Sequence, residues 1–157
     1  MNCSIRQATP DDAAAVAAMV KALTDEIIER TRARHFNVDL PQTTARCRDF
    51  METGKYAVYL AVGEAGRNVG FAALCESHAL YVGGTFGIVQ EFYVVPDLRS
   101  MGVGRQLLDA AAAHAQNSGW KRLELCTPPL PEFDRTLDFY EKNGFEVTGG
   151  RKMKRLA

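Results

Sequence analysis

The sequence has no excess of charge of one sign. Its 157 residues contain 19 lysines and arginines and 19 aspartates and glutamates, which gives a formal net charge of +0 at pH 7. Proteins that bind nucleic acids or anionic membranes by general electrostatic attraction carry strongly basic surfaces. Neither a nucleic acid nor a membrane is therefore expected as a partner.

Long apolar runs and cysteine pairs are also missing. No stretch approaches the roughly 20 apolar residues of a membrane-spanning helix. The N-terminal MNCSIRQATPDD has no basic segment followed by an apolar core, so no secretory signal is expected. The 4 cysteines form no C-x-x-C pair, and no set of His, Cys and carboxylate residues has metal-ligand spacing. We therefore expect no metal, a reducing compartment and a cytoplasmic location.

Hydrophobic periodicity and turn residues predict the secondary structure. Strands are predicted at residues 3–8, 56–62, 69–77, 88–95, 122–126, 145–149 and 152–156, with a turn at 83–87. Helices are predicted to begin at Pro10 and Pro41 and to cover residues 103–117 and 131–143. The three middle strands should be antiparallel, and the segment from 88 to 126 should form a parallel crossover. We expect one α/β domain over residues 1–157, with a mixed, mainly antiparallel central sheet and helices on both faces.

The segment VVPDLRSMGVGRQLL (94–108) places two glycines where a helix should begin. A tight turn from strand to helix leaves backbone N–H groups without intrahelical partners. Together with the positive end of the helix dipole, these groups attract an anion, above all a phosphate. Without side chains at Gly102 and Gly104, a diphosphate can approach the backbone closely. The alternative is a glycine-rich helix cap without a ligand.

This turn matches neither of two common phosphate-binding motifs. It has no G-x-x-x-x-G-K-[ST] frame, and Leu107 stands where a dinucleotide fingerprint needs its third glycine. Instead, V-x-P-x-x-R-x-x-G-x-G-x-x-L-L resembles the acetyl-CoA-binding motif of the GCN5-related N-acetyltransferases, the GNAT superfamily. IRQATPDDAAAV (5–16) resembles the opening strand and helix of that family, and FYEKNGF (139–145) resembles its C-terminal motif. The resemblance covers nearly the whole chain.

The resemblance implies a GNAT-like fold and acetyl-CoA as co-substrate. The turn that would hold the CoA pyrophosphate through its backbone amides consists of Arg99, Ser100, Met101, Gly102, Val103, Gly104 and Arg105. The pantetheine arm would lie like an extra strand along Phe92, Tyr93 and Val94, where strands 88–95 and 122–126 splay apart. Many members carry an asparagine seven residues before the C-terminal tyrosine. Phe133 stands there in this chain and offers no such side-chain hydrogen bond.

Tyr140 is the candidate general acid. The resemblance places it where many members have a tyrosine that donates a proton to the departing CoA thiolate, and a phenol, with a pKa near 10, can do so. The i, i+4, i+7 spacing of Phe133, Leu137 and Tyr140 predicts that Tyr140 points inward. A packed core tyrosine is the alternative.

Glu91 is the candidate general base. An alkyl ammonium with a pKa of about 10.4 must lose a proton before the amine can attack the thioester. Several members place an acid near the acceptor amine at this point of the strand, where Glu91 should share one face with Tyr93 and Val95. A solvated glutamate, with water carrying the proton, is the alternative.

The resemblance therefore implies an N-acetyltransferase that moves an acetyl group from acetyl-CoA to a primary amine of a small molecule or peptide. Residues 24–40 and 76–88 would shape the acceptor site, which His78 could face. His114, on the apolar side of its helix, is expected to be a core histidine. A non-catalytic acyl-CoA-binding regulatory or sensor domain and a larger acyl donor are alternatives, and a homodimer is a further expectation from the family.

Overall fold

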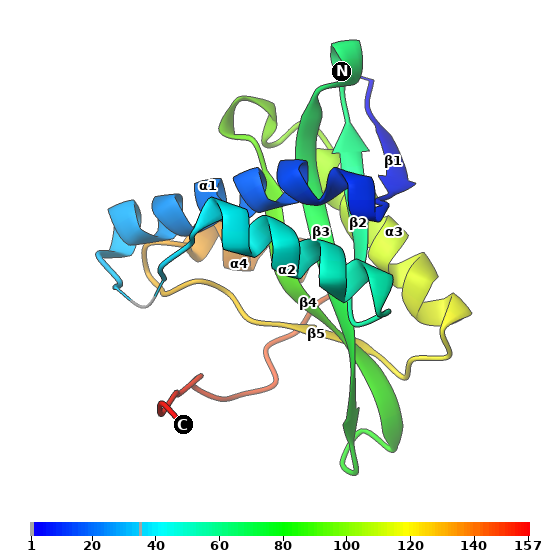
Figure 1. The fold of residues 1–157 in the computed structure, drawn as a ribbon. Coiled ribbons are helices and arrows are strands. Elements are labelled where there is room, and N and C mark those ends of the chain that lie inside the picture. The colour runs from blue at the N-terminus through cyan, green and yellow to red at the C-terminus, as the bar shows by residue number, and fades with distance from the viewer. Residues whose placement is uncertain (1, 35) are drawn as a thin grey trace. The chain divides into compact units, whose positions relative to one another are not determined.

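The computed structural model describes residues 2–34 and 36–157, and the chain forms two compact units, Met1–Leu125 and Cys126–Ala157. The first unit is a five-stranded sheet with three long helices (Figure 1). Its strands are β1 (Ser4–Gln7), β2 (Ala57–Val62), β3 (Asn68–Ala79), β4 (Gly84–Val94) and β5 (Leu123–Leu125). Its helices are α1 (Ala13–Thr31), α2 (Leu40–Glu52) and α3 (Val103–Asn117).

The strands lie in the order β1-β2-β3-β4-β5. Each neighbouring pair is antiparallel except β4 and β5, which are parallel, so the predicted antiparallel middle and the parallel strand after the helix are both confirmed. The predicted turn at 83–87 is wrong, because the chain already reverses at Leu80–Gly83 and β4 begins at Gly84. Gly87 serves close packing instead, since a Cβ there would overlap the ring of Trp120.

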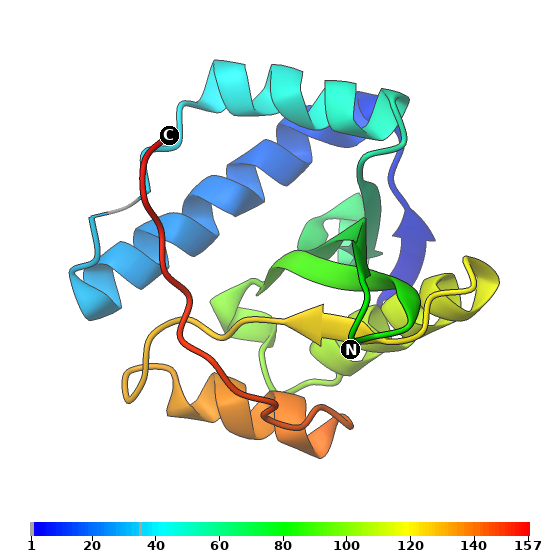
Figure 2. The same cartoon turned by 90° about the horizontal axis from the view of Figure 1, so that it is seen from below.

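Helices cover both faces of the sheet, as the sequence predicts. Helices α1 and α2 lie on one face and α3 on the other (Figures 1 and 2). The predicted apolar side of α1 is confirmed, because Val16, Met19 and Ile27 are buried. Within the described residues, every helix is too short or too polar to cross a lipid bilayer.

His114 is a core histidine, as expected. It is half-buried on α3, and its Nδ1 lies 2.9 Å from the hydroxyl of Tyr59. Trp120 packs edge-on against the same imidazole ring. Burial lowers the pKa of His114, so the neutral ring is favoured.

The second unit contains helix α4 (Asp134–Lys142), which ends before Gly144 as predicted but starts three residues later than Pro131. Phe133 and Tyr140 are buried, as their spacing predicts. The predicted strands at 145–149 and 152–156 are wrong, since none of the described residues of this unit is in a strand. Most of the tail after α4 is exposed, and an extended segment without a hydrogen-bonded neighbour is not stable in water.

Two identical substitutions test where the core lies. Leu107 of α3 is 0% exposed, whereas Leu80 at the hairpin tip is 101% exposed. We expect Leu107→Ala to lower the free energy of unfolding by about 2–5 kcal/mol, because it removes buried contacts and leaves a cavity. Leu80→Ala should stay within about 0.5 kcal/mol of the wild type. Chemical denaturation measures both, and similar losses for the two variants would contradict the core assignment.

Candidate functional site

The turn between β4 and α3 leaves the first turn of the helix uncapped. Gly102 is the N-cap residue of α3, and in the described part of the chain no side-chain hydrogen bond caps this end. The Gln106 N–H donates to the Gly102 carbonyl at 3.1 Å. The N–H groups of the residues before Gln106 therefore have no carbonyl one turn earlier in the helix. They and the helix dipole form an anion-attracting end.

The backbone conformation at this corner explains the glycine at position 102. Gly102 has φ of +87°, in the left-handed region that glycine adopts without penalty. A Cβ built on Gly102 would meet no atom within 4 Å. The space next to the Cα of Gly102 is therefore open.

Beside this corner, the end of β4 extends beyond its pairing with β5. Strand β5 pairs with β4 only over Gly87–Val89, so the later residues of β4 extend beyond their parallel neighbour. The pairing of β3 with β4 shifts between Ala73 and Leu74, which leaves Gln90 as the extra residue of a β-bulge. Sequence reasoning predicted that the two strands separate, but gave no signal for the bulge.

Backbone groups of Phe92 and Val94 point to this open edge. Residues in an antiparallel ladder alternate between pairs that exchange hydrogen bonds and pairs that do not. The Val95 N–H donates to the Val69 carbonyl at 2.9 Å, so Val95 turns toward β3 and both Val94 and Phe92 turn away from it. The Arg99 Nε–H donates to the Val94 carbonyl at 2.8 Å, in agreement with that orientation.

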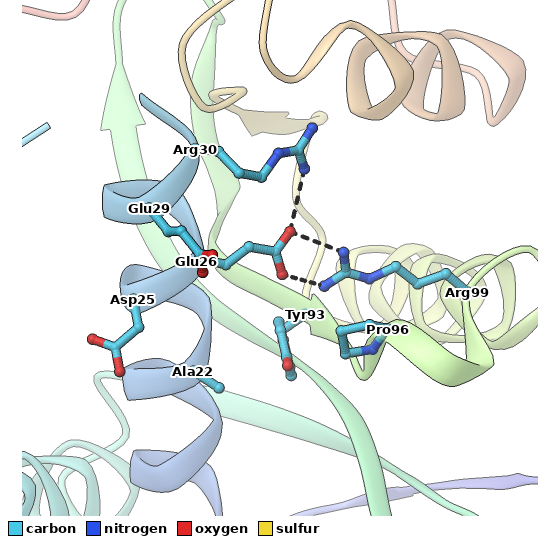
Figure 3. A pocket seen from close by; sticks show the side chains of 8 residues that line it. All are labelled: Ala22, Asp25, Glu26, Glu29, Arg30, Tyr93, Pro96 and Arg99. Carbon is cyan, nitrogen blue, oxygen red and sulfur yellow. Dashed lines mark hydrogen bonds and ion pairs between the residues drawn. The ribbon is translucent and has the colours of Figure 1, made fainter. Parts of the chain in front are cut away.

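The side chain of Arg99 points toward helix α1 (Figure 3). Its two terminal nitrogens donate to the two carboxylate oxygens of Glu26 at 2.9 and 2.6 Å. Arg30 also donates to Glu26, at 3.2 Å. The hydrogen bonds from Arg99 lower the pKa of the Glu26 carboxyl, so the pair is charged at neutral pH. Sequence reasoning missed Glu26, because no local pattern marks a contact 73 residues away.

This ion pair lies in a surface hollow of about 450 Å³. The C-terminal half of α1, the end of β4 and the loop that leads to the turn form its walls (Figure 3). Its lining residues are Ala22, Asp25, Glu26, Glu29, Arg30, Tyr93, Pro96 and Arg99. The hollow thus borders the part of the chain, 24–40, that the family resemblance assigns to the acceptor.

Glu91 lies on the same face of β4 as Tyr93, as predicted. It accepts a hydrogen bond of 3.1 Å from the hydroxyl of Tyr56, which precedes β2. Burial, with the charge of Glu91 nearby, raises the pKa of the Cys47 thiol to about 11 and also raises the pKa of Tyr56. The two neighbours of Glu91 on this side, the Cys47 thiol and the Tyr56 hydroxyl, therefore keep their protons at neutral pH. Sequence reasoning did not select Tyr56, whose contact with Glu91 crosses β3.

Tyr140 belongs to the second unit. It is 6% exposed, and its ring lies 5.5 Å from that of Phe139 and 5.8 Å from that of Phe145. Burial raises the pKa of the Tyr140 hydroxyl above its ordinary value. Such a phenol keeps its proton at neutral pH and can donate it, whereas it cannot serve as a base.

Of the remaining candidates, His78 lies near the tip of the β3–β4 hairpin. His78 is exposed and its Nδ1 lies 3.1 Å from the Thr85 hydroxyl, beside a hollow of about 260 Å³. His35, in the expected acceptor region, lies outside the described residues. Among the residues that the structure describes, no three His, Cys, Asp or Glu side chains are grouped to hold a metal ion.

Comparison with known proteins identifies the family. The family model described as "Acetyltransferase (GNAT) domain" matches residues 54–147, more than half of the chain. The chain is 31% identical over 147 residues to the uncharacterized N-acetyltransferase YhfO of Bacillus subtilis (strain 168), covering 94% of this chain and 92% of that protein. It is 35% identical over 127 residues to an aminoglycoside N(6')-acetyltransferase type 1 of Stenotrophomonas maltophilia, covering 76% and 72%.

The solved structures agree with this assignment at the level of the fold. An aminoglycoside N-acetyltransferase in complex with CoA superposes with a TM-score of 0.79 at 21% identity, covering 99% of this chain and 95% of that one. The mixed sheet with helices on both faces is therefore the GNAT fold that the glycine motif implies. The chain belongs to the GNAT family of acetyltransferases and is an acyltransferase.

Proposed function

We propose that the protein transfers an acetyl group from acetyl-CoA to a primary amine of a small molecule or peptide. The observation that carries this proposal is the open, uncapped N-terminus of α3 next to the end of β4 that extends beyond its parallel neighbour β5. Together they offer donors for a diphosphate and an edge for an extended arm. Family membership supports acyl transfer, and the aminoglycoside acetyltransferases among its relatives support an amine acceptor.

The residues at the turn fit a CoA diphosphate. Gly102 leaves the corner open, and the amides of the first turn of α3 face outward with the helix dipole behind them. In this proposal the backbone of residues 99–105 binds the pyrophosphate, as the sequence predicts. The charged side chain of Arg99 is held by Glu26, so backbone amides supply most of the binding.

The outward backbone groups of Phe92 and Val94 would hold the pantetheine arm, and the Val94 carbonyl would be shared with the Arg99 Nε–H. Pantetheine contains two amides, which can pair with a strand edge as a peptide does. The side chains of Phe92 and Val94 pack on the α3 face of the sheet, whereas that of Tyr93 packs on the α1 face. The edge is therefore held by packing on both faces. A rigid edge favours a fixed position of the thioester.

Acetyl-CoA would supply a thioester whose acetyl group goes to the amine nitrogen, with CoA leaving as the thiol. Tyr140 would supply the proton for the departing sulfur, because burial raises the pKa of its hydroxyl and holds the phenol in the protonated form at neutral pH. Glu91 would accept the proton that the acceptor ammonium must lose, directly or through water. Its place beside the extended end of β4 supports this assignment.

The acceptor would enter on the α1 side of β4. The hollow near the end of α1 has the carboxylates of Asp25, Glu26 and Glu29 in its wall, and the face with Glu91 adjoins the same helix pair. Arg30 and Arg99 line the same hollow and pair with Glu26, and Lys21 pairs with Asp25. The hollow therefore offers a protonated amine carboxylate partners in a nearly balanced set of charges. The acyl group and the acceptor are to be identified by a panel of acyl-CoA donors and amines.

Two glycines at opposite ends of α3 test the phosphate site. Gly102 and Gly119 both have positive φ and both leave open space for a Cβ, so the same substitution strains the backbone similarly at each. We expect Gly102→Glu to weaken CoA binding by roughly tenfold or more, about 1.4 kcal/mol. The new side chain brings a negative charge to the N-terminal amides, while Gly119→Glu changes only the far end.

Isothermal titration calorimetry with CoA measures both variants against the wild type. Gly119→Glu should keep its affinity within about twofold, well below the tenfold step that 1.4 kcal/mol represents. Equal losses for the two variants would indicate a general effect on the fold. A wild type that does not bind CoA would refute the proposed function.

Tyr140→Phe tests the general acid. The variant removes only the hydroxyl, so we expect turnover to fall by about 10²- to 10⁴-fold, the usual contribution of a positioned acid. Tyr59→Phe is the control, because Tyr59 also loses a half-buried hydroxyl that bonds a histidine, but on the face with α3. It should keep its turnover.

The readout is CoA thiol release across a panel of primary amines, including an aminoglycoside and a lysine peptide. The pH profile is then measured on the best acceptor. If Tyr140→Phe changes neither turnover nor the pH profile, Tyr140 is not the acid. Calorimetry with CoA on the same variant separates lost chemistry from lost binding.

A further inference from the structure

The turn that carries the outward amides is conformationally strained at one residue. Ser100 has φ of +63° although it is not glycine, and the left-handed region costs an L-residue about 1–2 kcal/mol. Such a conformation persists only where the surroundings enforce it. On one side of Ser100 the turn continues into Gly102 and α3. On the other side it begins at Arg99, so the anchoring of Arg99 decides how firmly the turn is held.

Arg99 is anchored in three directions. Its Nε–H donates to the Val94 carbonyl on β4, and its two terminal nitrogens bind both oxygens of Glu26 on α1. Its guanidinium carbon also lies 5.5 Å from the centre of the Tyr93 ring. One side chain therefore ties the start of the turn to the strand edge and to a helix on the face opposite α3.

We infer that Glu26 is a positioning residue for the CoA-binding turn and acts through the side chain of Arg99. The inference rests on the proposed function, because it concerns the geometry of the proposed pyrophosphate site. Glu26 does not touch that site itself. Its carboxylate fixes the guanidinium, the guanidinium fixes the start of the turn, and the turn aims the amides that follow Ser100.

The geometry distinguishes this pair from an ordinary surface ion pair. The side chains of Arg99 and Glu26 are 38% and 20% exposed, and one guanidinium engages both carboxylate oxygens, a bidentate arrangement that adds geometric specificity. A second pair, Arg67–Asp97, is also bidentate, and its aspartate lies two residues before Arg99 in sequence. Its side chains are 54% and 62% exposed, and exposed pairs contribute little.

These two pairs give a matched experiment. Glu26→Gln keeps the size of the side chain but removes the charge that holds Arg99. Asp97→Asn makes the same kind of change at the exposed pair in the same loop. We expect Glu26→Gln to weaken CoA binding by about three- to thirty-fold, the usual range for residues that act at a distance. Asp97→Asn should change the affinity by less than about twofold.

Calorimetry with CoA gives the affinities, and ¹⁵N-edited NMR of the free proteins reports on the turn directly. We expect the amide resonances of Gly102 and Gly104 to shift in Glu26→Gln and to stay in place in Asp97→Asn. A lower thermal midpoint for Glu26→Gln with unchanged CoA affinity and unchanged Gly102 and Gly104 resonances would overturn the inference. It would leave the ion pair as a stabilising contact only.

A double-mutant cycle keeps the test informative if one variant is partly unfolded. Glu26→Gln, Arg99→Gln and the double variant are compared by CoA affinity, with circular dichroism as the check on folding. If Glu26 acts through Arg99, the double variant should bind CoA about as weakly as Arg99→Gln alone. Additive losses would overturn the inference. The wild-type affinity separates this result from the proposed function, which fails only if the wild type does not bind CoA.

Discussion

The proposed site depends on backbone groups at the end of a strand and at the start of a helix that neither the neighbouring strand β5 nor the helix ladder uses. Folded proteins satisfy nearly all of their buried backbone N–H and C=O groups, and exposed strand edges and helix ends are the places where such groups remain available. Here the edge of β4 beyond Val89 and the uncapped start of α3 are joined by one short connection. The Arg99 side chain links the two, so an elongated ligand with amides and a diphosphate could satisfy both sets of groups.

The sequence was sufficient to predict the arrangement of the first unit, because its signals are local. Alternation predicts β2 to β4, the apolar side of α1 follows a helical period, and the glycine motif lies at the strand-to-helix turn where it was placed. The prediction failed at Gly84 and in the tail after α4. The first failure arose because glycines also occur inside strands where packing is close, as at Gly87. The second arose because an alternating pattern in a short segment does not ensure that a neighbouring strand is there to pair with it.

The parts that sequence could not supply are contacts between elements far apart in the chain. In the sequence, Glu26 is one of several charged residues on a predicted helix, and only the fold shows that it binds Arg99. Tyr56 likewise stands before a predicted strand, and only the fold shows its hydrogen bond to Glu91. The bulge at Gln90 is likewise a property of two strands and not of one. The bulge matters because it reverses the direction in which the backbone groups of every later residue of β4 point. As a result, the backbone groups of Phe92 and Val94 point away from β3.

The arginine of the glycine motif, Arg99, binds other protein groups, although its position suggests a phosphate ligand. An arginine beside a proposed diphosphate site would be expected to bind phosphate, yet the Arg99 guanidinium is neutralised by Glu26 and bonded to Val94. If the turn binds CoA, the attraction comes mainly from amides and the helix dipole, which act only over short distances and in a fixed direction. Affinity should then follow the geometry of the turn more than the number of positive charges around it. In that case helix α1, on the opposite face of the sheet from α3, would take part in cofactor binding, because it carries the carboxylate that holds this geometry.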